Sequence, residues 1–165
     1  MNERGERRSL LLVHHADAVG PDLDPLRPLS LKGRAQAEWL ARHAKAEGFR
    51  PDAIWHSGKL RARQTAEALL VACNPVARFQ LMRGLRPEDS PDWMLELLVV
   101  EEQTVAVVSH MPLVPALLER LTRRRSDFPL NGMVWLERDG PNVYRERWRI
   151  APPANVLAPE PGARD

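Results

Sequence analysis

Histidines stand at the ends of three apolar stretches of this sequence, where imidazole rings could do nucleophilic or acid–base chemistry. His14 and His15 follow the first stretch, His56 the second and His110 the third. Imidazole can act as a nucleophile or base near neutral pH, since its unperturbed pKa is about 6.5. Arg61 comes shortly after His56 and could hold an anion through its planar guanidinium. These residue types favour chemistry on a negatively charged substrate.

The elements that must position these side chains alternate between strand-like and helix-like patterns. We predict strands over 10–13, 53–55, 78–81, 104–108, 133–137 and 143–150. We predict helices from an N-cap at Ser30 to about Glu47, then over 60–72, over 92–102 and from Pro112 through Leu121. This order predicts a three-layer α/β/α sandwich around a mostly parallel sheet, and a hairpin around Asp139-Gly140 predicts an antiparallel edge.

Ligands of such a sheet bind beyond the carboxyl ends of its strands, so the residues that follow the strands should share one crevice. His14, His15, Ser57, Arg61 and His110 are the candidates. A helix that begins directly after His110 would add backbone N–H groups and a partial positive charge. We therefore expect a site for an anion.

Two other kinds of site are less compatible with the pattern. Several histidines could bind zinc, but neighbouring residues of a strand point to opposite faces, and no H-x-E or C-x-x-C spacing is present. A serine hydrolase is disfavoured because neither Ser57 nor Ser109 lies in a G-x-S-x-G elbow. We expect no metal.

The composition is that of an ordinary globular chain, with 44% apolar residues, 28% charged residues and a formal net charge of only +2. Nothing in it demands a nucleic-acid or membrane partner. A lone cysteine, Cys73, and the lack of a signal peptide or a long apolar run favour a cytoplasmic protein. We expect one domain over 9–150 and flexible tails over 1–8 and 151–165.

Four ordered motifs resemble those of the histidine phosphatase superfamily, above all its small bacterial phosphohistidine phosphatases. Segment 11–18 reads LLVHHADA where the family has a strand ending in R-H-G, often followed by D-A. Segment 27–33 reads RPLSLKG and matches R-P-L-S/T-x-x-G. Segment 57–65 reads SGKLRARQT and matches S-x-x-x-R-A-x-Q-T, and segment 109–114 reads SHMPLV and matches S-H-x-P-L-V. The resemblance covers about residues 9 to 150 and implies a phosphoglycerate mutase-like fold.

By this resemblance His15 is the nucleophile and forms a covalent phosphohistidine, without a cofactor. Arg61 and His110 would bind the phosphoryl oxygens and stabilise the transition state, with His14 and Ser57 also lining the phosphate pocket. The implied substrate is phosphohistidine on a protein. The alternative is a small phosphorylated molecule, but the short loops favour an open site and a protein substrate.

Two residues depart from the family pattern, because His14 replaces an arginine and Ala16 replaces a glycine. We expect His14 to imitate arginine only as an imidazolium at acid pH, and Ala16 to be strained if its φ is positive. A weakly active or non-catalytic phosphate-binding module is therefore an alternative. Glu88 and Asp89 are candidates for a general acid, although acidic residues between prolines are also ordinary in loops.

Overall fold

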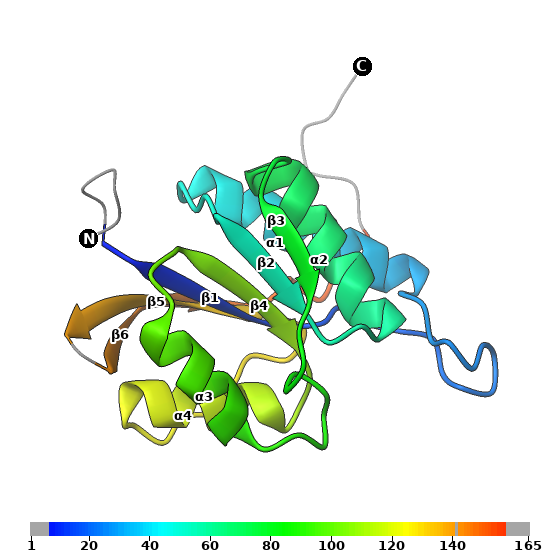
Figure 1. Ribbon diagram of the computed structural model, residues 1–165. Helices are drawn as coiled ribbons and strands as arrows, with labels where there is room; N and C mark the ends of the chain where they lie inside the picture. Colours follow the sequence, from blue (N-terminus) through cyan, green and yellow to red (C-terminus); the bar gives the residue numbers. More distant parts are fainter. Residues whose placement is uncertain (1–6, 141, 158–165) are drawn as a thin grey trace.

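The computed structural model describes residues 7–140 and 142–157, which form six strands and four helices (Figure 1). The strands are β1 (Ser9–His14), β2 (Ala53–His56), β3 (Arg78–Leu81), β4 (Val105–Ser109), β5 (Met133–Gly140) and β6 (Val143–Ile150). The helices are α1 (Leu31–Ala46), α2 (Leu60–Cys73), α3 (Pro91–Val100) and α4 (Leu113–Thr122). Every predicted element is present, with ends shifted by a few residues at most. Residues 1–6 and 158–165 of the expected tails lie outside the described part of the chain.

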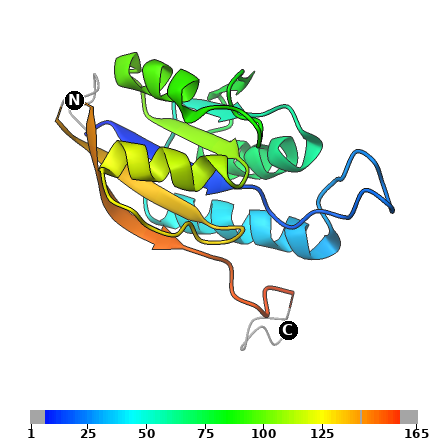
Figure 2. The ribbon, with the colours of Figure 1, turned by 90° about the horizontal axis from the view of Figure 1, so that it is seen from below.

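The six strands form one sheet in the order β3-β2-β4-β1-β5-β6. Strands β1 to β4 pair in parallel, while β5 and β6 pair antiparallel and form the edge. Helices α1 and α2 lie on one face, and α3 and α4 lie on the other (Figures 1 and 2). The predicted α/β/α sandwich with an antiparallel edge is confirmed.

Strand β1 lies in the middle of the sheet and is buried along its whole length. Leu10 and Leu12 belong to the core on the α3/α4 side, whereas Leu11 and Val13 belong to the core on the α1/α2 side. A central parallel strand needs apolar residues on both faces, which explains the uninterrupted run 10–13. The strand ends at His14, where polar side chains begin.

Helix α1 begins and ends at residues that the sequence indicates. The Ser30 hydroxyl accepts the Gly33 N–H as an N-cap, and Gly48 takes a left-handed conformation with φ of 83° after the last turn. Gly33 lets the chain pass closely, because a Cβ there would clash with the Asp17 carbonyl oxygen. The R-P-L-S-x-x-G motif thus packs the start of α1 against the chain that leaves β1.

No helix of the described residues is both long and apolar enough to cross a bilayer.

Candidate active site

The carboxyl ends of β1, β2 and β4 bring three histidines and one arginine together. His14 ends β1 and pairs with Ser109 at the end of β4, while the His15 N–H donates to the Ser109 carbonyl over 3.1 Å. The ring centroid of His15 lies 4.5 Å from that of His14 and 5.0 Å from that of His110. The structure therefore brings these strand-end side chains together.

The hydrogen bonds of His15 define which of its ring nitrogens carries a lone pair. Its Nδ1 lies 2.7 Å from the Ala16 carbonyl oxygen, which can only accept, so Nδ1 carries the hydrogen. Its Nε2 accepts a bond of 3.3 Å from Arg61 Nε. Burial lowers the pKa of His15 to about 4, and the charges of Arg61 and Arg27 act in the same direction. At neutral pH His15 is an uncharged imidazole with its Nε2 lone pair toward a cation.

Arg61 lies in the first turn of α2. Two polar side chains of that helix bond to the backbone of the segment that follows β1. Thr65 Oγ1 donates to the Arg61 carbonyl and accepts the Ala16 N–H, over 2.8 and 3.0 Å. Gln64 Oε1 accepts the Leu29 N–H over 2.7 Å. The conspicuous R-A-x-Q-T pattern therefore supplies one pocket residue and two residues that hold neighbouring backbone in place.

His110 is almost fully buried and bonded to Ser57. Its Nε2 lies 2.6 Å from Ser57 Oγ, which also accepts the Lys59 N–H over 3.3 Å. The Ser57 hydroxyl can donate to Nε2 or accept from it, so this bond is compatible with either neutral tautomer of His110. Within the described residues His110 Nδ1 is buried and has no partner. Burial, with nearby His15 and Arg61, holds the pKa of His110 far below its usual value, so the ring is neutral at neutral pH.

His14 differs from the cationic role expected for it. Its Nδ1 accepts the backbone N–H of Asn131 over 2.8 Å, so the hydrogen of the neutral ring is on Nε2. Burial, His15 and Arg61 lower the pKa of His14 to about 3. Protonation of Nδ1 would break the bond to Asn131. His14 is therefore a neutral ring at neutral pH, with its hydrogen on Nε2.

Ala16 is not strained in the way that its place in a glycine position suggested. It is not among the described residues with positive φ, and it is fully buried against Leu29 and Ala37. Its N–H and carbonyl are both used, by Thr65 and His15. Alanine fits this backbone without a left-handed conformation.

Arg27 is a pocket neighbour that the sequence reasoning did not select. Its positive charge lowers the pKa of both His15 and Arg61, which places it within electrostatic reach of the nucleophile candidate. It has φ of 49°, and its Nε donates to the Val19 carbonyl over 3.1 Å. The R-P-L-S-x-x-G motif contained this arginine, and its first position was the available signal.

Three other candidates lie in local structural contacts. Asp89 Oδ2 accepts the Arg86 N–H in a turn, and Glu88 is exposed in the same turn. Across the described residues, no hydrogen bond or ion pair connects either carboxylate to the histidines. His56 Nδ1 accepts the Gly58 N–H, and its ring packs against Phe79 at 4.8 Å between centroids. The structure thus gives the general-acid candidates no contact with the pocket.

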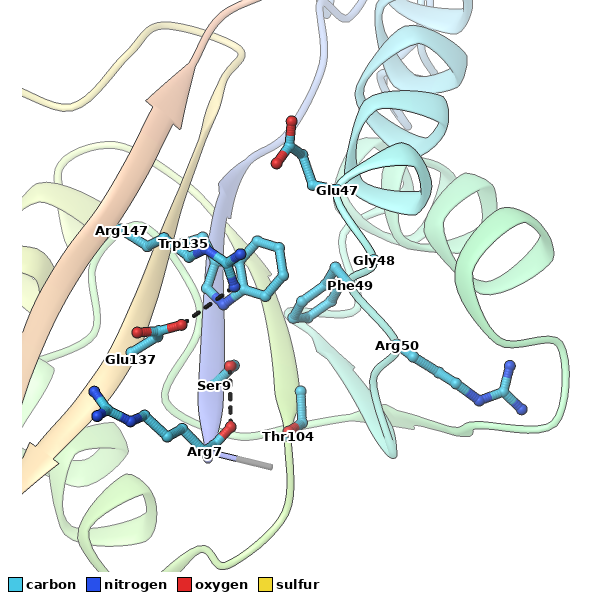
Figure 3. A pocket seen from close by; sticks show the side chains of 10 residues that line it. All are labelled: Arg7, Ser9, Glu47, Gly48, Phe49, Arg50, Thr104, Trp135, Glu137 and Arg147. Atoms are coloured by element: carbon cyan, nitrogen blue, oxygen red, sulfur yellow. Dashed lines mark hydrogen bonds and ion pairs between the residues drawn. The ribbon is translucent and has the colours of Figure 1, made fainter. Parts of the chain in front are cut away.

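The amino-terminal ends of the parallel strands, opposite the histidines, carry other kinds of side chain. A cavity of about 410 Å³ lies there, near the amino ends of β1 and β4 (Figure 3). Arg147 covers the Trp135 ring at 4.4 Å and pairs with Glu137 at 3.2 Å. The cavity has no histidine among its lining residues. In the part of the chain that the structure describes, no group of three or more His, Cys, Asp or Glu side chains is arranged to hold a metal ion.

Comparisons with known proteins agree with this arrangement. The family model described as "Histidine phosphatase superfamily (branch 1)" matches residues 14–94. The structure of the protein histidine phosphatase SixA complexed with tungstate has a TM-score of 0.79 at 23% identity, over 87% of this chain and 96% of that one. A protein from Agrobacterium tumefaciens assigned as phosphohistidine phosphatase SixA has a TM-score of 0.75 at 26% identity, over 90% and 100%.

A more distant structural likeness is a phosphoserine phosphatase from Entamoeba histolytica in complex with 3-phosphoglyceric acid. Its TM-score is 0.66 at 16% identity, over 91% of this chain and 100% of that one. No curated protein sequence matches this chain.

Proposed function

Since this chain belongs to the histidine phosphatase superfamily, we propose that it is a phosphatase that removes phosphate from phosphohistidine on a protein. His15 is the nucleophile and carries the phosphoryl group as a covalent intermediate. Arg61 and His110 bind the phosphoryl oxygens, with His14 beside them. Ser57 acts through its bond to His110 and orients that ring.

The fixed tautomer of His15 is the observation that carries this proposal. Its Nε2 lone pair forms the new bond to phosphorus while the P–N bond of the substrate breaks. The Nδ1 hydrogen stays on His15 throughout, where the Ala16 carbonyl accepts it over 2.7 Å. In the second step a water oxygen attacks phosphorus, the Nε2–P bond breaks and His15 returns to its starting form. The protons of that water go to phosphate and solvent.

The charges around His15 suit a phosphoryl group in transfer. Arg61 and Arg27 are permanent cations, and His110 is a neutral ring beside them. Donors fixed in place before the reaction stabilise the growing charge on the oxygens without reorganisation, and removal of one such donor typically costs about 10² to 10³ in rate. This arrangement supports phosphoryl transfer more than binding alone.

The leaving group explains why a general acid is dispensable. A phosphorylated imidazole can be protonated on its distal nitrogen, since the pKa of free imidazole is about 6.5. It then departs as neutral imidazole and takes no proton from the enzyme. An alkyl phosphate would need an acid at this point. The local contacts of Glu88 and Asp89 are therefore compatible with phosphohistidine as the substrate.

Exposed leucines in the segments that adjoin the ends of β1 and β3 and the start of β5 favour a protein as the carrier of that phosphohistidine. We name them the leucine rim: Leu23, Leu26, Leu31, Leu81 and Leu130, all of them at least 64% exposed. Leu26 directly precedes Arg27, and Leu130 directly precedes Asn131. The Leu81 side chain fills the space that a Cβ on Gly58 would occupy, next to Ser57. A protein that delivers its phosphoryl group to His15 would cover apolar surface here, which a small phosphate ester would not.

The test compares phosphate release from a histidine-phosphorylated protein, a serine-phosphorylated protein and phosphoimidazole. We expect rapid release from both phosphorylated imidazoles, little release from phosphoserine, and none with His15→Ala. Release from phosphoserine at an equal or higher rate would contradict the substrate assignment. Phosphate binding without release from any of them would instead support the non-catalytic alternative.

A further inference from the structure

Asn131 contacts both histidines at the end of β1, although it is far from them in sequence. Its backbone N–H donates to His14 Nδ1 over 2.8 Å, and its side-chain Nδ2 donates to the His15 carbonyl over 2.8 Å. One residue thus determines which His14 nitrogen carries a hydrogen and also holds the backbone of His15. None of the four sequence motifs includes it.

The backbone around Asn131 is a tight turn that favours asparagine. Gly132 N–H donates to the Pro129 carbonyl over 3.0 Å, and Asn131 has a positive φ of 51°. A positive φ at the third position of a turn is typical of Gly and Asn. Gly132 then lets the chain pass Ile150, whose carbonyl oxygen would lie 2.5 Å from a Cβ on residue 132. The carbonyl of Gly132 accepts the His14 N–H over 2.9 Å.

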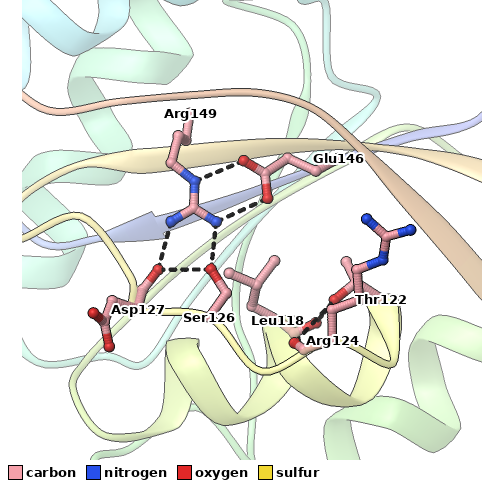
Figure 4. Close-up of polar contacts among 7 residues, drawn as sticks. All are labelled: Leu118, Thr122, Arg124, Ser126, Asp127, Glu146 and Arg149. Carbon is pink, nitrogen blue, oxygen red and sulfur yellow. Dashed lines mark hydrogen bonds and ion pairs between the residues drawn. The ribbon is translucent and has the colours of Figure 1, made fainter.

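The segment that leads to this turn is held against β6 by Arg149 (Figure 4). Arg149 donates to the Asp127 carbonyl over 2.6 Å and to Ser126 Oγ over 2.7 Å, while Glu146 pairs with it at 2.6 Å. Phe128 follows and is buried in the core. The turn at Asn131 is therefore fixed from both sides.

We infer that Asn131 is a positioning residue that holds His14 as a neutral Nε2–H donor toward the phosphoryl group, in place of the arginine that the family has there. The inference rests on the proposed function, because it takes a phosphoryl group as the ligand of His14. The two hydrogen bonds of Asn131 are features of the structure and do not depend on that function. A neutral ring with a fixed tautomer supplies one N–H and no charge. The permanent charge of the pocket then comes from Arg61 and Arg27.

The surroundings of His14 oppose its protonation. His15 follows it on the same strand, Arg61 approaches from α2 and His110 from the end of β4, and none of these is an anion. Adding a proton to Nδ1 would also remove the acceptor of the Asn131 N–H. His14 should therefore keep one tautomer between about pH 5 and 8, and phosphate binding should not require its titration.

Nitrogen NMR of His14 in the intact protein tests this directly. We expect a neutral ring with unprotonated Nδ1 from pH 5 to 8, with and without inorganic phosphate. Formation of an imidazolium in that range, or a hydrogen on Nδ1, would overturn the inference. This reading needs no turnover, so it stands apart from the test of the proposed function.

Substitutions at Asn131 separate the turn from the side-chain bond. Asn131→Gly keeps the positive φ and the N–H but loses the bond to the His15 carbonyl, whereas Asn131→Ala also strains the turn. We expect Asn131→Gly to keep the His14 tautomer. We expect Asn131→Ala to lose it, to bind phosphate about tenfold more weakly and to acquire a pH dependence of binding.

Asn142→Ala is the matched control, because Asn142 also has a positive φ, of 62°, in the β5–β6 hairpin. Equal effects of Asn142→Ala and Asn131→Ala on phosphate binding, or an unchanged tautomer in Asn131→Ala, would overturn the inference.

Discussion

Arg61 Nε donates to His15 Nε2 over 3.3 Å, which joins a permanent cation to the atom that we propose attacks phosphorus. A phosphorus atom in line with that lone pair would have its oxygens beside the guanidinium. Burial lowers the pKa of His15 to about 4, and the charge of Arg61 acts in the same direction. Arg61 would thus bind the charge of the substrate and add to the effect that keeps the nucleophile neutral.

Arg61→Ala should lower kcat/KM for phosphoimidazole by about 10² to 10³, because it removes a donor aimed at the transferring oxygens. It should also raise the pKa of His15, which proton NMR titration would measure. Arg63→Ala is the control on the same helix, since Arg63 is exposed and pairs with Glu67 at 3.0 Å. Unchanged kcat/KM in Arg61→Ala would remove Arg61 from the proposed pocket.

The sequence predicted the layers and the mostly parallel sheet with its antiparallel edge because their signals are local. The apolar run before His14, the N-cap at Ser30 and the glycine at 48 each reflect neighbours within a few positions. The motif around Arg61 predicted a helix start that the structure confirms.

Tertiary partners account for what the sequence could not predict. The state of His14 depends on Asn131, which is 117 positions away and belongs to no motif. The backbone N–H of Ala16 is held by Thr65, which is far away in sequence. Arg27 has a left-handed backbone conformation, which an arginine in a sequence does not indicate. The general-acid candidates were chosen by residue type alone, and the turn of Arg86 and Asp89 uses one of them for a backbone bond.

The leucine rim predicts a difference between protein and small substrates. Leu26→Ser and Leu31→Ser together should raise KM for a histidine-phosphorylated protein by at least about tenfold, since full burial of one leucine contributes about 1.5 to 3 kcal/mol and about 1.4 kcal/mol is a factor of ten. The kcat/KM for phosphoimidazole should stay the same. Val76→Ser is the control, because Val76 is 84% exposed before β3 at the other end of the sheet. A parallel loss on both substrates would mean that these leucines support the pocket and not the partner.

The buried histidines predict that acid destabilises the fold. His14 and His15 have pKa values of about 3 and about 4 in the folded protein, against about 6.5 when unfolded. Below pH 6.5 the unfolded chain binds protons that the folded chain does not. The free energy of unfolding therefore decreases as the pH is lowered. It should be highest above about pH 6.5 and decrease steadily toward pH 4. Urea denaturation at pH 7.5, 6 and 5 measures this, and equal midpoints would contradict the lowered pKa values.

Covalent labelling of His15 tests the central claim most directly. The protein is incubated with phosphoimidazole that carries labelled phosphate, quenched under alkaline conditions and analysed by peptide mass spectrometry. We predict one phosphorylated residue, His15, with label at Nε2, and no label in His15→Ala. His110→Ala should still label at His15, although slowly, because His110 only assists transfer. Label on His110 or His14 in the wild type, or turnover by His15→Ala, would contradict the account.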